Sequence, residues 1–357
     1  KEKKCTCPDH QQRECKCKHI WAVELTVTRE VDEQGNVVEK HEYEKTEQNW
    51  TAYNAAQTNE QPLFMELLSD LCSTIKTEES TGRGRPSKQL DDILFLSAMK
   101  VYSGFSLRRF ESMMDIAQER GHVTETCGYN TISRYMNKEE LTPILHNLIE
   151  KSASPLTAVE TEFGVDSSGF STSTFGKFCE YKHEEGKEVR KWVKAHIMAG
   201  VNSNIVTGVE LNIGHEGDAP NFKPLLEKTA KQFDVDMVAA DKAYSSREIH
   251  ELVDQLGAEA YIPFKDNTQD GGRFRGTSAW KKMYHKFQYE SHEFWPEYKK
   301  RNNVETTFHM IKSKFGEDVN SKKERAQLNE VLLKILAHNI AVVIQETYEL
   351  GIKSNFT

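Results

Sequence analysis

Residues 298–312, with the sequence YKKRNNVETTFHMIK, have the periodicity of an α-helix. Tyr298, Arg301, Glu305 and Lys312 are separated by three, four and seven positions, so on one continuous helix they share a narrow face. One interpretation is a solvated face with ion pairs between residues four apart. The other is a site in which the carboxylate holds a metal ion and its neighbours hold phosphates. The remainder of the chain must distinguish the two.

The composition is that of a polar, soluble globular protein. The 357 residues are 37% hydrophobic and 29% charged, which is enough for two or three domains with a sizeable core. No apolar run approaches the length of a membrane span and no signal peptide is visible, so we expect no membrane partner. The chain begins at Lys1 rather than at Met, which indicates a fragment or a trimmed product and leaves an upstream targeting segment open.

The charge is distributed unevenly along the chain. The net charge of -8 argues weakly against a nucleic-acid partner, but its distribution matters more than its sum. Residues 1–80 carry 10 Lys and Arg against 16 Asp and Glu. Residues 271–325 carry 13 against 7, a net charge of +6. Because phosphate contacts need only local cations, this pattern is compatible with a DNA partner.

The N-terminal segment contains four of the seven cysteines within its first seventeen residues. Such a cluster in a chain with few other cysteines indicates metal binding in a cytosolic protein rather than a disulfide framework. Three thiolates and one imidazole make the closed tetrahedral set of a structural Zn²⁺ site, although Cys15 and His10 are alternative ligands and exposed thiols in a disordered tail are the competing interpretation. The predicted ligands are Cys5, Cys7, Cys17 and His19.

The spacing C-x-C-x(n)-C-x-H, followed by an apolar helix start, resembles the SWIM zinc finger. That resemblance covers residues 5 to about 25 and implies binding of DNA or protein. Only four residues precede Cys5, where the family has strands, so we expect a finger truncated at its start.

Changes in pattern divide the chain into four parts: 1–27, 28–61, 62–156 and 157–348. The first is the zinc finger, and the second is a polar linker or an exposed hairpin turning at Gly35. The third is helical, and two of its helices, the second carrying Arg134 and Tyr135, suit a helix-turn-helix that binds DNA, with a plain helical hairpin as the alternative. Its GRGRP stretch is either a basic minor-groove arm or a flexible loop.

The fourth part has the pattern of an α/β domain with the order β-β-β-α-β-α-β-α, which predicts a mixed sheet flanked by helices. Asp166 and Asp241 each end a predicted strand, and strand ends are where sites form in open α/β sheets. If the two strands are neighbours, Glu305 from the last helix completes a cluster of three carboxylates. Such a cluster is favourable when a divalent cation sits between its members.

The chemistry of this cluster predicts a phosphoryl-transfer site. Hard oxygen ligands select Mg²⁺ or Mn²⁺, and two such ions about 4 Å apart stabilise the attacking and leaving oxygens. Asp166, Asp241 and Glu305 are therefore the predicted metal ligands. Tyr298, Arg301 and Lys312 are predicted to hold the DNA backbone beside these metal ligands.

Three other side chains have competing interpretations. His196 alternates with Trp192 and Lys194 on one strand, and a hydrogen-bonded core histidine is favoured over one that touches DNA. Trp280 and Trp295 precede the last helix, where packing in the core is favoured over stacking on a flipped base.

Three segments resemble the insertion-sequence DDE transposases of bacteria and archaea. Y-x2-R-x3-E-x6-K resembles their Y-R-E-K motif, while VDSSGF and ADKAY resemble the segments around their two catalytic aspartates. The resemblance spans residues 60 to 345 and includes a helical DNA-binding part. It implies an RNase H-like catalytic domain with the triad Asp166, Asp241 and Glu305, two divalent ions, and cleavage of DNA followed by joining of the 3′ hydroxyl to a target.

The resemblance also implies double-stranded DNA as partner, a homodimer or larger synaptic assembly, and a nucleoid-associated location in the prokaryotic cytoplasm. Two features depart from the family pattern: the 63 residues between Asp241 and Glu305 are too few for a large β insertion domain, and the zinc finger is an addition. The competing functions are a transposase-derived zinc-finger DNA-binding protein without catalysis and a hydrolytic RNase H-like nuclease.

Overall fold

The computed structural model divides the chain into two compact units, residues 1–50 and 51–357. The residues that the structure describes are 27–31, 37–41, 49–75, 88–172, 192–214, 217–265, 268, 277–354 and 356. The predicted zinc ligands Cys5, Cys7, Cys17 and His19 lie outside the described residues, as does the GRGRP stretch.

The first unit contains a pair of antiparallel strands, β1 (Val27–Val31) and β2 (Val37–His41), with Val31 opposite Val37. This pairing agrees with the hairpin alternative for the segment that follows the predicted finger. Helix α3 (Trp50–Ser73) begins before Pro62, inside the predicted linker, so the helical region starts earlier than the sequence pattern indicated.

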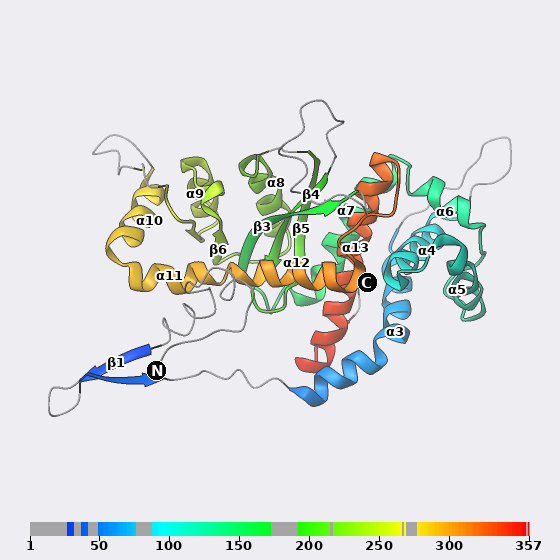
Figure 1. Ribbon diagram of the computed structural model, residues 1–357, viewed down its shortest axis with the longest axis horizontal. Coiled ribbons are helices and arrows are strands. Elements are labelled where there is room, and N and C mark those ends of the chain that lie inside the picture. Colours follow the sequence, from blue (N-terminus) through cyan, green and yellow to red (C-terminus); the bar gives the residue numbers. More distant parts are fainter. Residues whose placement is uncertain are drawn as a thin grey trace, which may run out of the picture. The chain divides into compact units, whose positions relative to one another are not determined.

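The helical region follows the order expected from its periodicity (Figure 1). Its second helix, α4 (Leu90–Ser103), is capped by Gly104, whose φ of 66° is the left-handed conformation that glycine adopts readily at a helix end. The two helices of the predicted helix-turn-helix are present, but residues 120–128 connect them, a longer segment than the 3–4-residue turn of that motif. The helices after α3 are α4 (Leu90–Ser103), α5 (Leu107–Glu119), α6 (Tyr129–Tyr135) and α7 (Leu141–Ala153).

The α/β part is built on a five-stranded mixed sheet with helices against it, as predicted. The strand order is β5-β4-β3-β6-β7. The first three pair antiparallel, whereas β6 is parallel to both β3 and β7. The parallel pairings need crossovers, which α8 (Ala219–Ala230) and α9 (Arg247–Asp254) provide. The strands are β3 (Glu162–Ser171), β4 (Trp192–Gly200), β5 (Val206–Ile213), β6 (Met237–Ala240) and β7 (Glu259–Tyr261).

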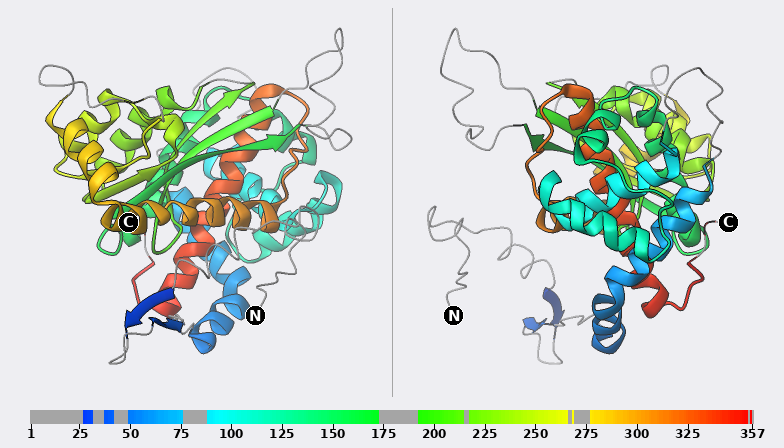
Figure 2. Two further views of the ribbon diagram at one scale, coloured as in Figure 1. Left: turned by 60° about the vertical axis from the view of Figure 1, so that its left-hand side comes forward. Right: turned by 90° about the vertical axis from the view of Figure 1, so that its right-hand side faces the viewer.

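The long helix α13 (Glu324–Glu349) joins the helical region to the sheet (Figure 2). It contacts α4 and α7 as well as β4 and β5, so both parts share one hydrophobic core. By length and composition it is apolar enough to cross a membrane, which the sequence pattern did not reveal. However, 89% of its apolar window is buried inside the protein, as in the core helix of a globular domain.

Burial of Glu346 near the end of α13 predicts a pH-dependent stability. Burial, reinforced by Glu349 and Glu160, raises the pKa of this carboxyl from 4.5 to about 7. Because the folded state holds the proton more tightly, the free energy of unfolding falls as pH rises from about 4.5 through about 7. Glu346→Gln is therefore expected to stabilise the protein at pH 8 by on the order of 1 kcal/mol and to have little effect at pH 4.

Urea unfolding at the two pH values measures this effect, with the exposed Glu119→Gln on α5 as the matched control. A stability gain that is the same at pH 4 and pH 8 would show that Glu346 is not titrating in this range.

Candidate active site

The sheet brings Asp166 and Asp241 to neighbouring positions. The last register pair between the parallel strands β3 and β6 is Val165 with Ala240, and each aspartate is the next residue along its chain. Adjacent strands lie about 4.8 Å apart, so the two carboxylates extend from adjacent backbone positions. Asp166 is not at a strand end, as the sequence had indicated. It lies inside β3, because β4 continues to pair with residues 167–171 after β6 has ended.

Glu305 reaches the same place through an arginine. The guanidinium of Arg301 donates from Nη1 to Oδ2 of Asp166 at 2.7 Å and from Nη2 to Oε1 of Glu305 at 2.7 Å. Arg301 precedes the first residue of α12 (Asn302–Phe315), and Glu305 lies in its first turn. One cation therefore joins a carboxylate of the sheet to a carboxylate of the helix.

The helix predicted for residues 298–312 is two helices. α11 (Ser291–Lys299) ends before α12 begins, and the two follow one another along one line (Figure 1). Backbone hydrogen bonds between residues three apart, as in a 3₁₀ turn, tighten the chain at the junction. In one of them the N–H of Arg301 donates to the carbonyl of Tyr298. The backbone of Arg301 keeps helical dihedral angles, so the predicted face is maintained across the break.

Tyr298 and Lys312 lie on either side of this arginine along the helices. Tyr298 is half-buried and stacks on Phe294 with ring centroids 6.3 Å apart, and burial raises its pKa. The ammonium of Lys312 donates to Oγ of Ser168 at 2.7 Å and to the carbonyl of Gly169 at 2.8 Å. These two bonds fix Lys312 to β3 just beyond Asp166. Burial lowers the pKa of the Lys312 ammonium.

The electrostatics of Asp166 reflect the neighbouring acids. Burial raises its pKa, the backbone N–H of Ser167 and the charge of Arg301 lower it, and the charges of Glu305 and Asp241 raise it. The charges of both other acids therefore act on Asp166 in the same direction. Arg301 supplies the compensating positive charge in this arrangement.

The donor set matches a hard divalent cation in its chemistry. Asp166, Asp241 and Glu305 offer carboxylate oxygens, which Mg²⁺ and Mn²⁺ prefer. Within the described residues, no three Asp, Glu, His or Cys side chains are grouped closely enough to hold a metal ion as they stand. The guanidinium of Arg301 takes the place between two of the acids that a cation would share.

The other candidate side chains divide between core and surface. His196 is fully buried between the hydroxyl of Tyr244 at 3.4 Å and the amide of Asn221 at 3.3 Å, and burial lowers its pKa to about 4. It is thus the hydrogen-bonded core histidine that the sequence favoured. Trp280 is buried, as expected, but Trp295 is 40% exposed, so the expected core position is wrong for this residue.

Asp218 is a charged neighbour of the site that the sequence pattern did not single out. Its carboxylate accepts a hydrogen bond from Oγ of Ser167 at 3.3 Å and pairs with Lys194. It lies just before α8, where an aspartate is ordinary at a helix start, so no local signal marks it. Asp218 therefore contacts Ser167, the residue next to Asp166.

The close approach of α12 to β3 depends on a glycine. A Cβ added at Gly164 would lie 2.3 Å from Cγ2 of Val304, which is far inside contact distance. Gly164→Ala is therefore expected to push α12 away from the sheet, to cost about 1–3 kcal/mol of stability and to separate Glu305 from Asp166. Urea unfolding measures the first effect. Gly217→Ala is the control, because its Cβ would meet nothing within 4 Å; equal stabilities of the two variants would contradict the close packing.

The region that holds these acids matches a known family. A family model described as "Transposase DDE domain" matches residues 158–340. The chain belongs to this transposase DDE domain family. The match runs from just before β3 into α13 and includes Asp166, Asp241 and Glu305. It confirms the predicted transposase family, whereas the Y-R-E-K subgroup and the SWIM finger stay predictions.

Two individual proteins are similar to this transposase over most of its length. An uncharacterized protein of Aquifex aeolicus (strain VF5) is 24% identical over 294 residues, which cover 79% of this chain and 87% of that protein. The cryo-EM structure of the piggyBac transposase synaptic complex with hairpin DNA matches with a TM-score of 0.37 and 10% identity, covering 86% of this chain and 77% of that one.

Proposed function

We propose that this transposase cleaves DNA at the ends of a mobile element and joins the freed 3′ hydroxyl to target DNA, with Asp166, Asp241 and Glu305 as its catalytic acids. The observation that carries the proposal is the convergence of Asp166 and Glu305 on the guanidinium of Arg301, beside the backbone position of Asp241. Three antiparallel strands followed by two parallel ones support an RNase H-like catalytic domain.

The three acids would hold two Mg²⁺ or Mn²⁺ ions, which activate the attacking oxygen and stabilise the leaving oxygen when bound. Arg301 has a rigid, planar guanidinium of the kind that binds phosphate in a bidentate manner. In the proposed complex it holds a backbone phosphate next to Asp166. In the same proposal the hydroxyl of Tyr298, on α11, and the remaining N–H of the Lys312 ammonium, on α12, make further contacts to the DNA backbone.

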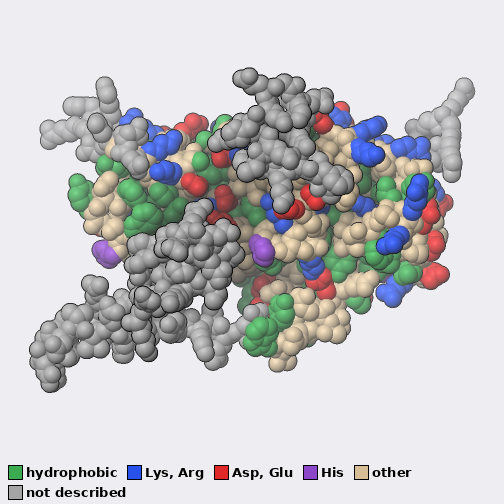
Figure 3. Space-filling view, viewed as in Figure 1, with side chains coloured by type: hydrophobic (Ala, Val, Ile, Leu, Met, Phe, Trp, Pro, Cys, Tyr) green, Lys and Arg blue, Asp and Glu red, His purple; other side chains and the backbone are tan. Residues whose placement is uncertain are grey.

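The proposal includes double-stranded DNA as the partner and a homodimer or larger assembly that brings two ends together. The basic segment 271–325 supports a DNA partner. Over α5 and α6, Lys and Arg side chains are interspersed with Asp and Glu (Figure 3). A structural Zn²⁺ on Cys5, Cys7, Cys17 and His19, and a nucleoid-associated location in the prokaryotic cytoplasm, complete the proposal.

A cleavage and joining assay tests this function. The full chain is incubated with labelled duplexes that carry the DNA flanking its gene, a supercoiled target plasmid, and Mg²⁺ or Mn²⁺. We expect nicks with 3′ hydroxyl ends and, later, label joined to the plasmid, both abolished by EDTA. Binding without cleavage would favour the non-catalytic DNA-binding protein, and cleavage without joining would favour the hydrolytic nuclease.

A further inference from the structure

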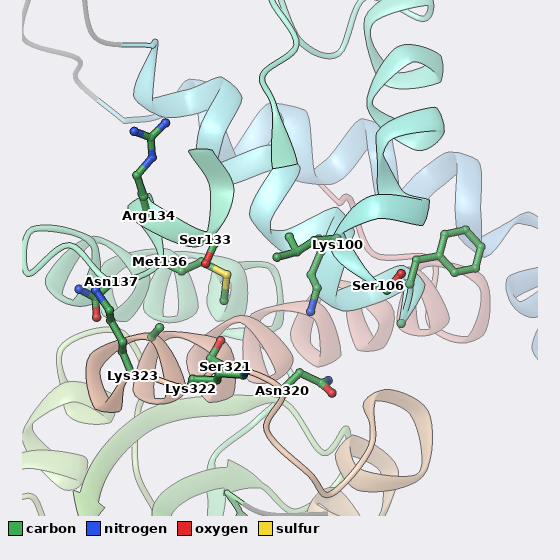
Figure 4. A pocket seen from close by; sticks show the side chains of 14 residues that line it. Lys100, Ser106, Ser133, Arg134, Met136, Asn137, Asn320, Ser321, Lys322 and Lys323 are labelled. Carbon is green, nitrogen blue, oxygen red and sulfur yellow. The ribbon is translucent and has the colours of Figure 1, made fainter. Parts of the chain in front are cut away.

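A second site lies between the helical region and the loop that leads into α13. The structure has a cavity of about 700 Å³ there, separate from the three acids (Figure 4). Its walls come from the α4–α5 junction, from α6 and from residues 320–323. None of its lining residues is acidic. The charged side chains among them are Lys100, Arg134, Lys322 and Lys323.

Lys100 is the buried cation of this cavity. It is 8% exposed, and its side chain extends from α4 into the cavity towards Asn320 and Ser321 (Figure 4). Among the residues that the structure describes, its ammonium has no hydrogen-bond or ion-pair partner. A lysine side chain that is more than nine-tenths buried and has no anionic partner is unfavourable, so its position indicates that the cavity receives a negatively charged group.

Two helices begin at the same cavity. Ser106 is the N-cap of α5 and Lys323 is the N-cap of α13, and neither helix start has a side-chain cap hydrogen bond. The amide groups at a helix start carry a partial positive charge and bind anions such as phosphate. The two helix starts therefore reinforce the charge of Lys100.

The wall opposite Lys100 adds two exposed lysines. Lys322 and Lys323 lie on a loop whose preceding amides, those of Asn320 and Ser321, donate to the carboxylate of Glu330 at 3.0 and 2.8 Å. That carboxylate fixes the loop while leaving both ammonium groups on the solvent side. Arg134 lies at the edge of the cavity and donates to Thr131 instead.

We propose that this cavity binds phosphate groups of the DNA backbone, at a site separate from the catalytic acids. The inference rests on the proposed function for the choice of DNA as the source of the phosphates. A cavity of about 700 Å³ is much larger than one phosphate group, and it opens to solvent at the exposed lysines, as a site for a continuous strand requires. DNA held here is bound by the helical region and the catalytic domain at once.

Salt-dependent DNA binding by the full chain tests this site. Binding of a labelled duplex is followed by fluorescence anisotropy across a range of NaCl concentrations. Lys322→Gln with Lys323→Gln is expected to reduce the slope of log Kd against log salt by about 2, because each lost phosphate contact removes close to one released counterion. Lys100→Met, which retains most of the side chain's volume, is expected to reduce it by about 1.

The matched control is Lys231→Gln with Lys353→Gln, which removes the same charge from exposed positions outside the cavity and should leave the slope unchanged. Thermal unfolding identifies a Lys100→Met protein that fails to fold, and in that case the variant Lys322→Gln with Lys323→Gln decides. An unchanged slope in Lys322→Gln with Lys323→Gln overturns the proposal. Cleavage of DNA by that same variant shows that the proposed function survives.

Competition distinguishes DNA from a small anion. Pyrophosphate and ADP are added to the wild-type complex at constant ionic strength. We expect each to displace the duplex only at millimolar concentration. Displacement at micromolar concentration that is lost in Lys322→Gln with Lys323→Gln would assign the cavity to a free phosphate compound and overturn the backbone proposal. Failure of the wild-type chain to bind any duplex would instead overturn the proposed function together with this inference.

Discussion

Asp241→Asn is expected to lower the rate of strand cleavage by at least about 10³-fold and to leave DNA binding close to that of the wild type. Asp241 occupies the register position beside Asp166, and its charge acts on both Asp166 and Arg301. Asparagine keeps the size of the side chain but loses the negative charge on which a divalent-metal site depends. The backbone of β6 and the helical start after it need no carboxylate charge, so we expect the fold to be retained.

Single-turnover cleavage and anisotropy on the same duplex measure the two effects. The control is Asp254→Asn, which removes the same charge from an exposed position at the end of α9. Asp166→Asn and Glu305→Gln are expected to behave as Asp241→Asn does. Cleavage at the wild-type rate in any of the three would remove that residue from the proposed set of catalytic acids.

The binding of Mn²⁺ separates a metal ligand from a residue that only supports the fold. Titration of the DNA-bound protein, followed by electron paramagnetic resonance of free Mn²⁺, is expected to show weaker binding in Asp241→Asn and unchanged binding in Asp254→Asn. Wild-type Mn²⁺ affinity together with slow cleavage would indicate that Asp241 acts in some other way than by holding a metal ion.

The order of the α/β elements was available from the sequence because hydrophobic periodicity carries it. Alternation predicts β4 and β5, and the continuous apolar run of β6 is typical of a buried parallel strand. The length of β3 was not available in this way. Residues 167–169 are Ser, Ser and Gly, as in a turn, yet they pair with β4, because a partner strand supplies hydrogen bonds that local propensity does not reveal.

The candidate site was predictable in its residues more than in its contacts. Spacing alone indicates the ion pair between Arg301 and Glu305, four positions apart on a helix. The second bond of Arg301, to Asp166, joins residues 135 positions apart and depends on how α12 crosses β3. The two interpretations of residues 298–312 thus coincide, since the ordinary helical ion pair is half of the bridge between two candidate catalytic acids.

The cavity around Lys100 was beyond reach of the sequence for a similar reason. Lys100 lies on a helix whose neighbouring residues are nearly all buried, and a lysine there resembles any other until the loop 320–323 is placed opposite it. Sequence periodicity reports on one helix at a time. A site that brings Lys100 opposite residues 320–323 needs the tertiary structure.

Asn339→Leu is expected to reduce the free energy of unfolding by at least about 3 kcal/mol, the largest stability effect that we predict. Asn339 is fully buried on α13. Its Oδ1 accepts from the amide of Val206 at 2.9 Å, and its Nδ2 donates to the carbonyl of Val206 at 2.7 Å and to Oγ of Ser152 at 2.9 Å. Leucine has a similar shape but leaves the backbone N–H and C=O of Val206 without this partner, while Oγ of Ser152 keeps its bond to the carbonyl of Ile149.

The reason for so large an effect is the position of Val206. It begins β5, an edge strand of the sheet, and the side-chain amide of Asn339 pairs with both of its backbone groups as a neighbouring strand would. Because Ser152 belongs to α7, the same amide joins α7, α13 and the sheet edge. Asn147→Leu on the exposed face of α7 is the control, and it should change stability by no more than about 0.5 kcal/mol. A loss below about 1 kcal/mol in Asn339→Leu, measured by urea unfolding, would mean that water or a shifted backbone satisfies Val206.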